Sequence, residues 1–396
     1  MPVSRERRMI LGYLGLLTRR QVLWVAGGLI AMLALVVAGL LVDGGGPAPE
    51  AGAFNAGMSL RETAKKLDST GKAVARELGL PLEVPKDAPL AELGITEKRL
   101  GETVHHLLGH HDSSLKYWLY AALTVWGWIF LARIGRLEGG VRKKDRKAWY
   151  PRIFYTIALL LAVVVAGFLL GKSPNPMEGA VKVFKSMVGL YPDVLAKVLA
   201  FLFFLALAIV GNKIVCGWGC PFGALQELLH SIPWLKKLKR RAKPPFLVMN
   251  LIRTALFLVM LLLLFGVVGG RKGFVVYHYV NPFNLFNLAF DSVSVVVTIL
   301  ASLLLGLLIY RPFCQVICPF GFLSWLAERL SLYRVRIDHD LCDECGVCAK
   351  ACPSSAADGL VKKDPLRADC FSCGECLNVC HTDAIRYESV FRTRSG

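Results

Sequence analysis

The chain is poor in charged residues and has no cysteine in its first half. Of its 396 residues only 19% are charged and 55% are hydrophobic, whereas an average soluble domain has more of the former and less of the latter. None of the twelve cysteines precedes Cys216, and all fall into short repeated spacings. This pattern excludes the disulfide framework of a small secreted protein and indicates metal binding in a reducing compartment.

Acidic residues are also scarce. The 29 Asp and Glu residues against 47 Lys and Arg residues give a formal net charge of +18. The basic residues gather beside apolar segments, where they act as topology signals rather than as a nucleic-acid surface. We therefore expect membrane lipid, and no nucleic acid, as a partner.

Apolar runs of bilayer length predict about six membrane-spanning helices. They lie near residues 21–42, 115–134, 153–170, 194–210, 246–268 and 293–309. If these spans alternate, the basic segments that flank the first, second and fifth all fall on one side, which is the cytoplasmic side. We expect a multi-pass protein of a bacterial-type cytoplasmic (inner) membrane with both termini in the cytoplasm. Residues 18–23 resemble a twin-arginine export signal, so cleavage of the first apolar run is the alternative.

Eight cysteines near the C-terminus form two motifs with the spacing C-x2-C-x2-C-x3-C. The motifs are Cys342, Cys345, Cys348 and Cys352, then Cys370, Cys373, Cys376 and Cys380. Such a pair holds two [4Fe-4S] clusters, and the last cysteine of each motif ligates the other cluster. One predicted ligand set is thus Cys342, Cys345, Cys348 and Cys380, and the other is Cys352, Cys370, Cys373 and Cys376. Zinc knuckles are the alternative, although zinc has no use for an exchanged fourth ligand.

The second tail motif departs from the usual pattern. Pro353 follows Cys352, whereas His381 follows Cys380. Because proline fixes the backbone of its neighbourhood, we expect the replacement to alter the local backbone.

A different cysteine pattern, C-x3-C-P-F-G, occurs twice, each time after an apolar span and before a predicted helix. Its cysteines are Cys216, Cys220, Cys314 and Cys318. Each copy also follows a loop with an Asn-Pro pair, so we predict an internal two-fold repeat about an axis along the membrane normal. We expect the four cysteines to converge as a third [4Fe-4S] site, with thiolates favoured by the helix starts. Redox-active or copper-binding thiols and structural cysteines are the alternatives.

These residues carry a resemblance to a known family. The stretch C-G-W-G-C-P-F-G-A-L-Q-E-L, the second C-x3-C-P-F-G and the two four-cysteine motifs resemble the NapH/NosR-type membrane ferredoxins over about 153–387. The resemblance implies electron transfer between the quinone pool and a protein partner, with the ferredoxin domain in the cytoplasm. Nothing in 43–114 looks like the flavin-attachment motif of the NosR type. A more distant resemblance, to CcoG-type proteins of cytochrome oxidase assembly, implies copper handling.

The two loops on the predicted outer side are amphipathic and aromatic. One interpretation is a structural cap at the lipid interface, and the other is a quinone or quinol pocket whose polar groups are Lys182, His278 and Tyr279. Four histidines, His105, His106, His110 and His111, precede the second span and suit either a haem or metal site or a polar helix end. His230 shows no evident partner and is expected on the surface.

The predicted fold class is an α-helical polytopic membrane domain followed by a C-terminal α+β ferredoxin-like domain. We divide the chain into a basic N-terminus with the first span (1–42), a small extracytoplasmic helical segment (43–114), a membrane domain (115–334) and a cytoplasmic 2[4Fe-4S] domain (335–396). The predicted function is electron transfer between quinone or quinol and a redox protein partner, as in a quinol-dehydrogenase type oxidoreductase. The alternative is a maturation or regulatory protein that reduces metal or thiols for the assembly of another enzyme. A transporter is disfavoured because the spans have almost no ionisable residues in their middles.

Overall fold

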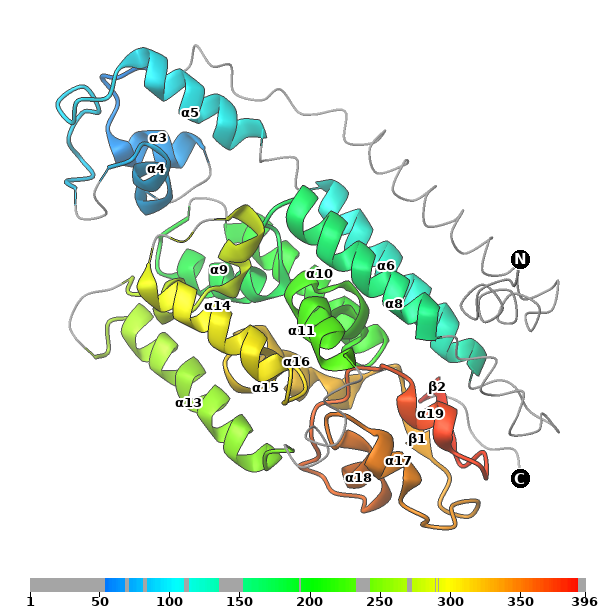
Figure 1. The fold of residues 1–396 in the computed structure, drawn as a ribbon. Helices are drawn as coiled ribbons and strands as arrows, with labels where there is room; N and C mark the ends of the chain where they lie inside the picture. Colours follow the sequence, from blue (N-terminus) through cyan, green and yellow to red (C-terminus); the bar gives the residue numbers. More distant parts are fainter. Residues whose placement is uncertain are drawn as a thin grey trace, which may run out of the picture.

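The structure is a computed structural model that describes residues 54–67, 71–80, 84–109, 114–134, 152–191, 194–232, 243–268, 273–288, 290 and 292–390. Most of the described chain is helical. Three small helices lie at one end of a helical bundle, and a small domain with two strands lies at the other end (Figure 1).

The small helical segment has its own apolar core. It comprises α3 (Leu60–Lys66), α4 (Gly71–Glu77) and α5 (Glu97–Gly109). Ser59 and Glu62 form a capping box at the start of α3. Leu60, Val74 and Leu100 are fully buried together. Because α3 and α4 are too short to be stable alone, apolar contacts between the helices stabilise this segment.

Five apolar helices form the bundle. They are α6 (Ser114–Ile134), α8 (Arg152–Leu161) with its π-helical continuation η2 (Ala162–Leu169), α10 (Val194–Val210), α13 (Phe246–Leu264) and α14 (Val293–Gly306). Among the described residues, the segments Leu115–Ala132 and Phe246–Leu264 are long and apolar enough to cross a membrane, with mean hydropathy 1.2 and 2.4. The helices over Phe154–Leu169, Val194–Val210 and Val293–Gly306 are apolar but shorter. The predicted span near 21–42 lies outside the described residues.

The outward faces of these helices are apolar. On α13, Leu247 and Leu251 are each 59% exposed, and on α14 Val293 and Leu304 are 80% and 64% exposed. A soluble protein rarely exposes so much contiguous apolar surface, whereas lipid accepts it at no cost. The chain is a membrane protein.

Short elements close the two ends of the bundle. One group comprises α9 (Pro176–Met187), η5 (Val276–His278) and η6 (Pro282–Asn287). The other comprises η3 (Val215–Gly219), α11 (Pro221–Ser231), α15 (Pro312–Val316), α16 (Pro319–Ala327) and η7 (Glu328–Leu330). The second group carries both C-x3-C-P motifs, at the end of the bundle that meets the small two-stranded domain (Figure 1).

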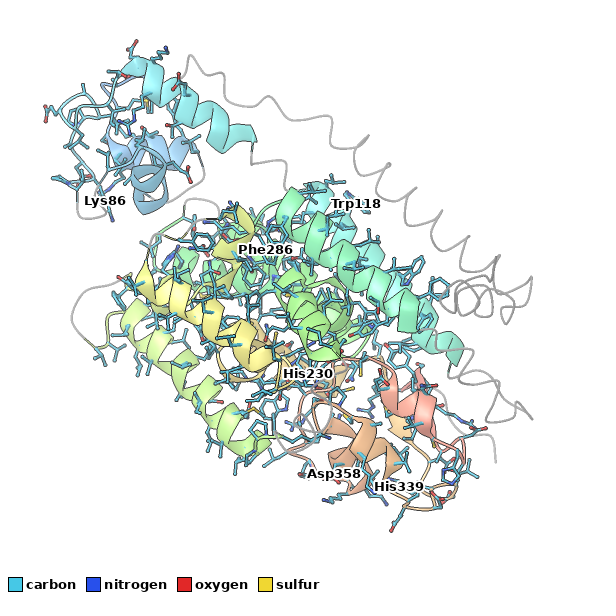
Figure 2. The ribbon with its side chains drawn as sticks, viewed as in Figure 1. Lys86, Trp118, His230, Phe286, His339 and Asp358 are labelled. Carbon is cyan, nitrogen blue, oxygen red and sulfur yellow. The ribbon has the colours of Figure 1, made fainter. Side chains whose placement is uncertain are left out.

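The C-terminal domain is built on one antiparallel strand pair. Strand β1 (Tyr333–Ile337) pairs with β2 (Ile385–Ser389), with Val335 opposite Tyr387. Between the strands lie α17 (Val347–Ala351), α18 (Ala356–Val361) and α19 (Glu375–Val379). This ferredoxin-type region contains all eight cysteines of the tail. Figure 2 labels His339 and Asp358 on its side away from the apolar helices.

Candidate metal centres

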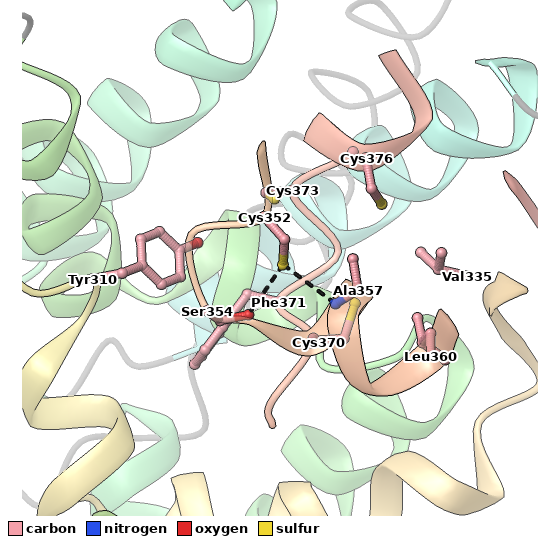
Figure 3. A pocket seen from close by; sticks show the side chains of 12 residues that line it. Tyr310, Val335, Cys352, Ser354, Ala357, Leu360, Cys370, Phe371, Cys373 and Cys376 are labelled. Atoms are coloured by element: carbon pink, nitrogen blue, oxygen red, sulfur yellow. Dashed lines mark hydrogen bonds between the residues drawn. The ribbon is translucent and has the colours of Figure 1, made fainter. Parts of the chain in front are cut away.

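The tail cysteines fall into two sets in space. The inner set, Cys352, Cys370, Cys373 and Cys376, lines one cavity together with Phe371 and Tyr310 (Figure 3). In the outer set, Cys342, Cys345, Cys348 and Cys380, the Cys348 thiol interacts electrostatically with the other three thiols. Each set joins three cysteines of one motif to the last cysteine of the other, which is the exchange that the spacing predicts.

His381 leaves the backbone at its motif unchanged. Cys380 has φ −68° and ψ 120°, and Cys352, which precedes a proline, has φ −67° and ψ 118°. The expected backbone change is therefore wrong. Instead, Nε2 of His381 lies 2.7 Å from the Asp343 carboxylate, and its Nδ1 lies 3.8 Å from Sγ of Cys345.

The four cysteines of the C-x3-C-P motifs, here called the membrane set, also converge. Cys216 lies in η3, Cys314 lies in α15, and Cys220 and Cys318 are the N-cap residues of α11 and α16. The Cys318 thiol interacts electrostatically with the other three. Cys216, Cys220 and Cys314 are buried, and Cys318 is partly buried.

Burial is the largest influence on the pKa of these thiols. It raises the pKa of the Cys314 thiol to about 11 despite the charge of Arg311, and it raises the pKa of Cys216, Cys220 and Cys318. That the helix starts favour thiolate at these positions stays a prediction. Buried thiols of this kind ionise when a metal binds them, since a metal supplies the compensating positive charge.

The two motifs share a local geometry. Lys213 and Arg311 each stand three residues before the first cysteine, both have positive φ (61° and 45°), and both are fully buried. The second cysteines have similar backbone angles, with φ −70° and ψ 118° at Cys220 and φ −62° and ψ 120° at Cys318. The amide of Gly321 donates to Sγ of Cys318 at 3.3 Å.

Buried ion pairs join these basic residues to other parts of the chain. The Lys213 ammonium pairs with the Asp369 carboxylate, and Arg253 of α13 donates to the same carboxylate at 3.1 Å. Arg311 pairs with Glu227 at 3.0 Å and donates to the Gly217 carbonyl at 2.8 Å and to the Cys216 carbonyl. Charges this deeply buried need partners, so the pairs fix how these segments pack.

The segment Asp369–Cys373 of the tail lies directly against both membrane motifs. Trp218 donates from Nε1 to the Ser372 carbonyl at 2.9 Å, and Ser372 donates from Oγ to the Asn212 carbonyl at 2.8 Å. The ring of Phe371 lies 5.0 Å from the Lys213 ammonium and 5.1 Å from the Arg311 guanidinium. We call this contact between 369–373 and the two motifs the seam.

Gly217 is required by the closeness of the seam. A Cβ atom at this position would overlap the backbone carbonyl of Phe371. A backbone carbonyl cannot move aside as a flexible side chain can, so glycine is the residue that this approach demands.

The predicted quinone-site residues lie at the opposite end of the bundle. The Lys182 ammonium pairs with Glu178 at 2.8 Å, and the neighbouring Lys185 contacts His278 at 3.4 Å and the Tyr191 hydroxyl at 3.2 Å. Burial alone would raise the pKa of Glu178, but the charge and hydrogen bond of Lys182 lower it to about 2. Tyr279 lies apart, 44% exposed and stacked on Phe274.

The remaining histidines lie in different parts of the chain. His105 and His106 belong to α5, whereas His110 and His111 lie outside the described residues. The expectation that His230 has no partner is wrong, because its Nδ1 lies 3.3 Å from the Gly306 carbonyl and its ring packs on Tyr310.

Sequence reasoning missed several residues that build the centres. Asp369, Arg253 and Arg311 have partners more than sixty residues away in the chain. Glu328 accepts from the Cys370 amide, 42 residues away, at 3.2 Å. For Asp369 the available signal is its position directly before Cys370, the first cysteine of the second tail motif.

Comparison with known proteins finds two families of 4Fe-4S binding domains in the chain. The family described as a 4Fe-4S binding domain matches residues 195–242 and 292–337, and a second family with the same description matches 335–358. The first two matches cover the two C-x3-C-P motifs.

Several curated proteins are similar to the chain. The ferredoxin-type protein NapH of Haemophilus influenzae is 29% identical over 50% of this chain and 70% of its own length. The putative electron transport protein YccM of Escherichia coli is 24% identical over 66% of this chain and 69% of its own length. The regulatory protein NosR of Pseudomonas aeruginosa is 29% identical over 44% of this chain but only 25% of its own length. No solved structure matches the chain.

Proposed function

We propose, from the membership of this chain in the NapH/NosR-type 4Fe-4S ferredoxin family, that it relays electrons between membrane quinone or quinol and a redox protein partner. Membership of this family makes the chain an iron-sulfur electron-transfer protein. The seam supports the proposed passage of electrons between the membrane part and the tail.

The seam brings two ligand sets together. Cys370 and Cys373 of the inner set flank Phe371, and Phe371 contacts the residues that precede Cys216 and Cys314. Electron transfer between two centres needs short distances through packed protein rather than through water. The buried contacts of the seam exclude water from the region between the inner set and the membrane set.

The residues suit [4Fe-4S] groups. Four cysteines line one cavity, burial raises the pKa of the Cys370 thiol to about 12, and the Ala357 amide lies 3.5 Å from Sγ of Cys352 as a donor to a thiolate. When bound, a [4Fe-4S] group supplies one-electron oxidation and reduction. The chain holds the ligands, shields them from water and sets their distance from each other.

The outer set is the end from which a protein partner would approach. Cys345 is exposed, and Leu341 and Val347 beside it are 46% and 41% exposed. A partner can therefore reach the outer set, whereas the seam covers the inner set.

We propose that the membrane set holds a third [4Fe-4S] group, because its four thiols are mutual neighbours beneath the seam. Three such groups need about twelve irons per chain. Replacing Cys216 and Cys314 together with alanine should lower the iron content of the purified protein to about eight, since two of four ligands are lost.

Iron and acid-labile sulfide quantitation checks this prediction. Ser302→Ala, a buried substitution on α14 outside the cysteine motifs, should leave about twelve irons. A content near eight in the unaltered protein would remove the third group from the proposal.

An internal repeat and the predicted topology belong to the proposal. Three observations support the repeat: the shared geometry of the two motifs, the two matches to one family, and the N-cap Asn175 and Asn281 before Pro176 and Pro282. The opposite placement of α9 and the cysteine motifs along the bundle (Figure 1) supports spans that alternate. The four-region division of the chain stays a prediction.

Quinol binding would use the polar contacts of α9 and η5. His278, next to Lys185, can accept a proton near neutral pH, and Lys182 and Tyr279 are the further predicted groups. Replacing His278 with alanine should slow reduction of the protein by a soluble quinol analogue about 100-fold, since a positioned proton acceptor contributes at least that much.

Stopped-flow absorbance of the iron-sulfur chromophore measures this rate. Dithionite, which needs no proton acceptor, should reduce the variant at the unaltered rate. His339→Ala, at the far end of the molecule (Figure 2), is the matched histidine control. An unchanged quinol rate in the His278 variant would remove the site.

Burial of the membrane set disfavours the alternative of a thiol-reducing maturation protein. Thiol exchange needs an accessible, low-pKa thiolate, and three of these four cysteines are buried with raised pKa.

A further inference from the structure

One side chain from outside the ferredoxin-type region reaches the inner set. Of the residues that line the inner cavity, Tyr310 alone comes from before residue 335. It follows α14 and precedes Arg311. The membrane part of the chain therefore contributes one wall of a cavity whose other walls belong to the tail.

The Tyr310 hydroxyl is buried and has no hydrogen-bond partner among the described residues. Figure 3 shows its oxygen directed into the cavity toward Cys352. A buried hydroxyl without a partner destabilises the folded state, because it loses its hydrogen bonds to water and gains none in return. Phenylalanine would fill the same space without that cost, so the hydroxyl requires an acceptor that the protein atoms do not supply.

The ring is held in this direction by its neighbours. It packs edge-on against Phe371 with centroids 5.7 Å apart and against His230 at 5.5 Å, and the Arg311 guanidinium lies 5.6 Å from it. Gln315 donates to the Tyr310 backbone carbonyl. The hydroxyl therefore cannot turn away from the cavity without disturbing the seam.

The other polar group near Cys352 already has a partner. Ser354 donates from Oγ to the Asp369 carbonyl at 2.7 Å. The Tyr310 hydroxyl faces sulfur atoms that can accept a hydrogen bond, either those of the cysteines that line the cavity or those of a group that these cysteines hold.

We propose that Tyr310 donates a hydrogen bond to sulfur of the [4Fe-4S] group held by the inner set and thereby raises its reduction potential. This inference rests on the proposed function, since it requires that group. Hydrogen bonds to sulfur are one of the determinants of cluster potential, because they stabilise the more negative, reduced state. A residue from the membrane part of the chain thus affects the reduction potential of the group held by the inner set.

Arg311, the residue after Tyr310, contacts the membrane set. Arg311 donates to the carbonyls of Cys216 and Gly217 at the membrane set. One dipeptide thus contacts both ligand sets, with Tyr310 at the inner set and Arg311 at the membrane set.

The test is Tyr310→Phe in the full chain, purified without oxygen and followed by redox-titrated electron paramagnetic resonance. We expect the signal of the [4Fe-4S] group held by the inner set, here called the inner signal, to remain in the spectrum. Its midpoint potential should fall by about 59 mV, which corresponds to a tenfold change in a one-electron equilibrium. Tyr333→Phe removes a phenol hydroxyl that does not line the cavity and should leave the midpoint unchanged.

A second measurement detects the hydrogen-bonding proton itself. Electron–nuclear double resonance of the reduced unaltered protein should show a strongly coupled exchangeable proton, which Tyr310→Phe removes and Tyr333→Phe keeps. An inner signal with an unchanged midpoint and no such proton would overturn the role of Tyr310 alone. A protein without any inner signal would overturn the proposed function as well.

Discussion

Replacing Asp369 with asparagine should destabilise the protein by about 3–5 kcal/mol, the cost of removing one partner from a buried ion pair. Asp369, Lys213 and Arg253 are all fully buried. Asparagine has the same shape but no charge, so two cations would remain buried without compensation. The midpoint of thermal unfolding, measured on detergent-purified protein, should fall accordingly.

Asp358→Asn is the matched control for this substitution. Asp358 also pairs with a lysine, Lys362, but the two side chains are 45% and 69% exposed. An exposed pair of this kind contributes at most about 0.5 kcal/mol. Equal midpoints for the Asp369 and Asp358 variants would contradict the structural role of the buried triad.

Replacing Gly217 with alanine should separate the tail from the membrane motifs. The added methyl group meets the Phe371 carbonyl, and overpacking of a close contact costs about 1–3 kcal/mol. Because Phe371 stands between two ligands of the inner set, we also expect the magnetic coupling between the inner and membrane sets to weaken. Pulsed electron paramagnetic resonance of the reduced protein measures that coupling.

Gly101→Ala is the control with the opposite expected sign. Gly101 lies within α5, and a Cβ there has no heavy atom within 4 Å. Alanine in such a helix stabilises by up to about 1 kcal/mol relative to glycine. A Gly217 variant with unaltered coupling and stability would show that the seam tolerates the methyl group and would contradict our account of it.

The hydropathy pattern predicted the bounds of some apolar helices well and those of others less well. The expected segments 115–134 and 194–210 coincide with α6 and α10, whereas α13 ends at Leu264 and α14 at Gly306, earlier than expected. Those ends depend on hydrogen bonds and turns that a hydropathy pattern does not contain.

The cysteine sets were predictable because ligand spacing is a local property. The seam was not, because it depends on contacts between segments such as Trp218 and Ser372, 154 residues apart. Lys213 illustrates the difference, since a lysine after an apolar helix indicates a membrane boundary from sequence alone, yet its ammonium is buried against Asp369. The phenol of Tyr310 carries no sequence signal at all.

The triad around Asp369 also bears on biogenesis. Lys213 comes from the first motif, Arg253 from the helix before the second, and Asp369 from a region that is synthesised after both. Until the tail emerges and docks, the inserted helices hold two cations that lack their carboxylate. The membrane part therefore reaches its stable state only after the iron-binding tail has docked on it.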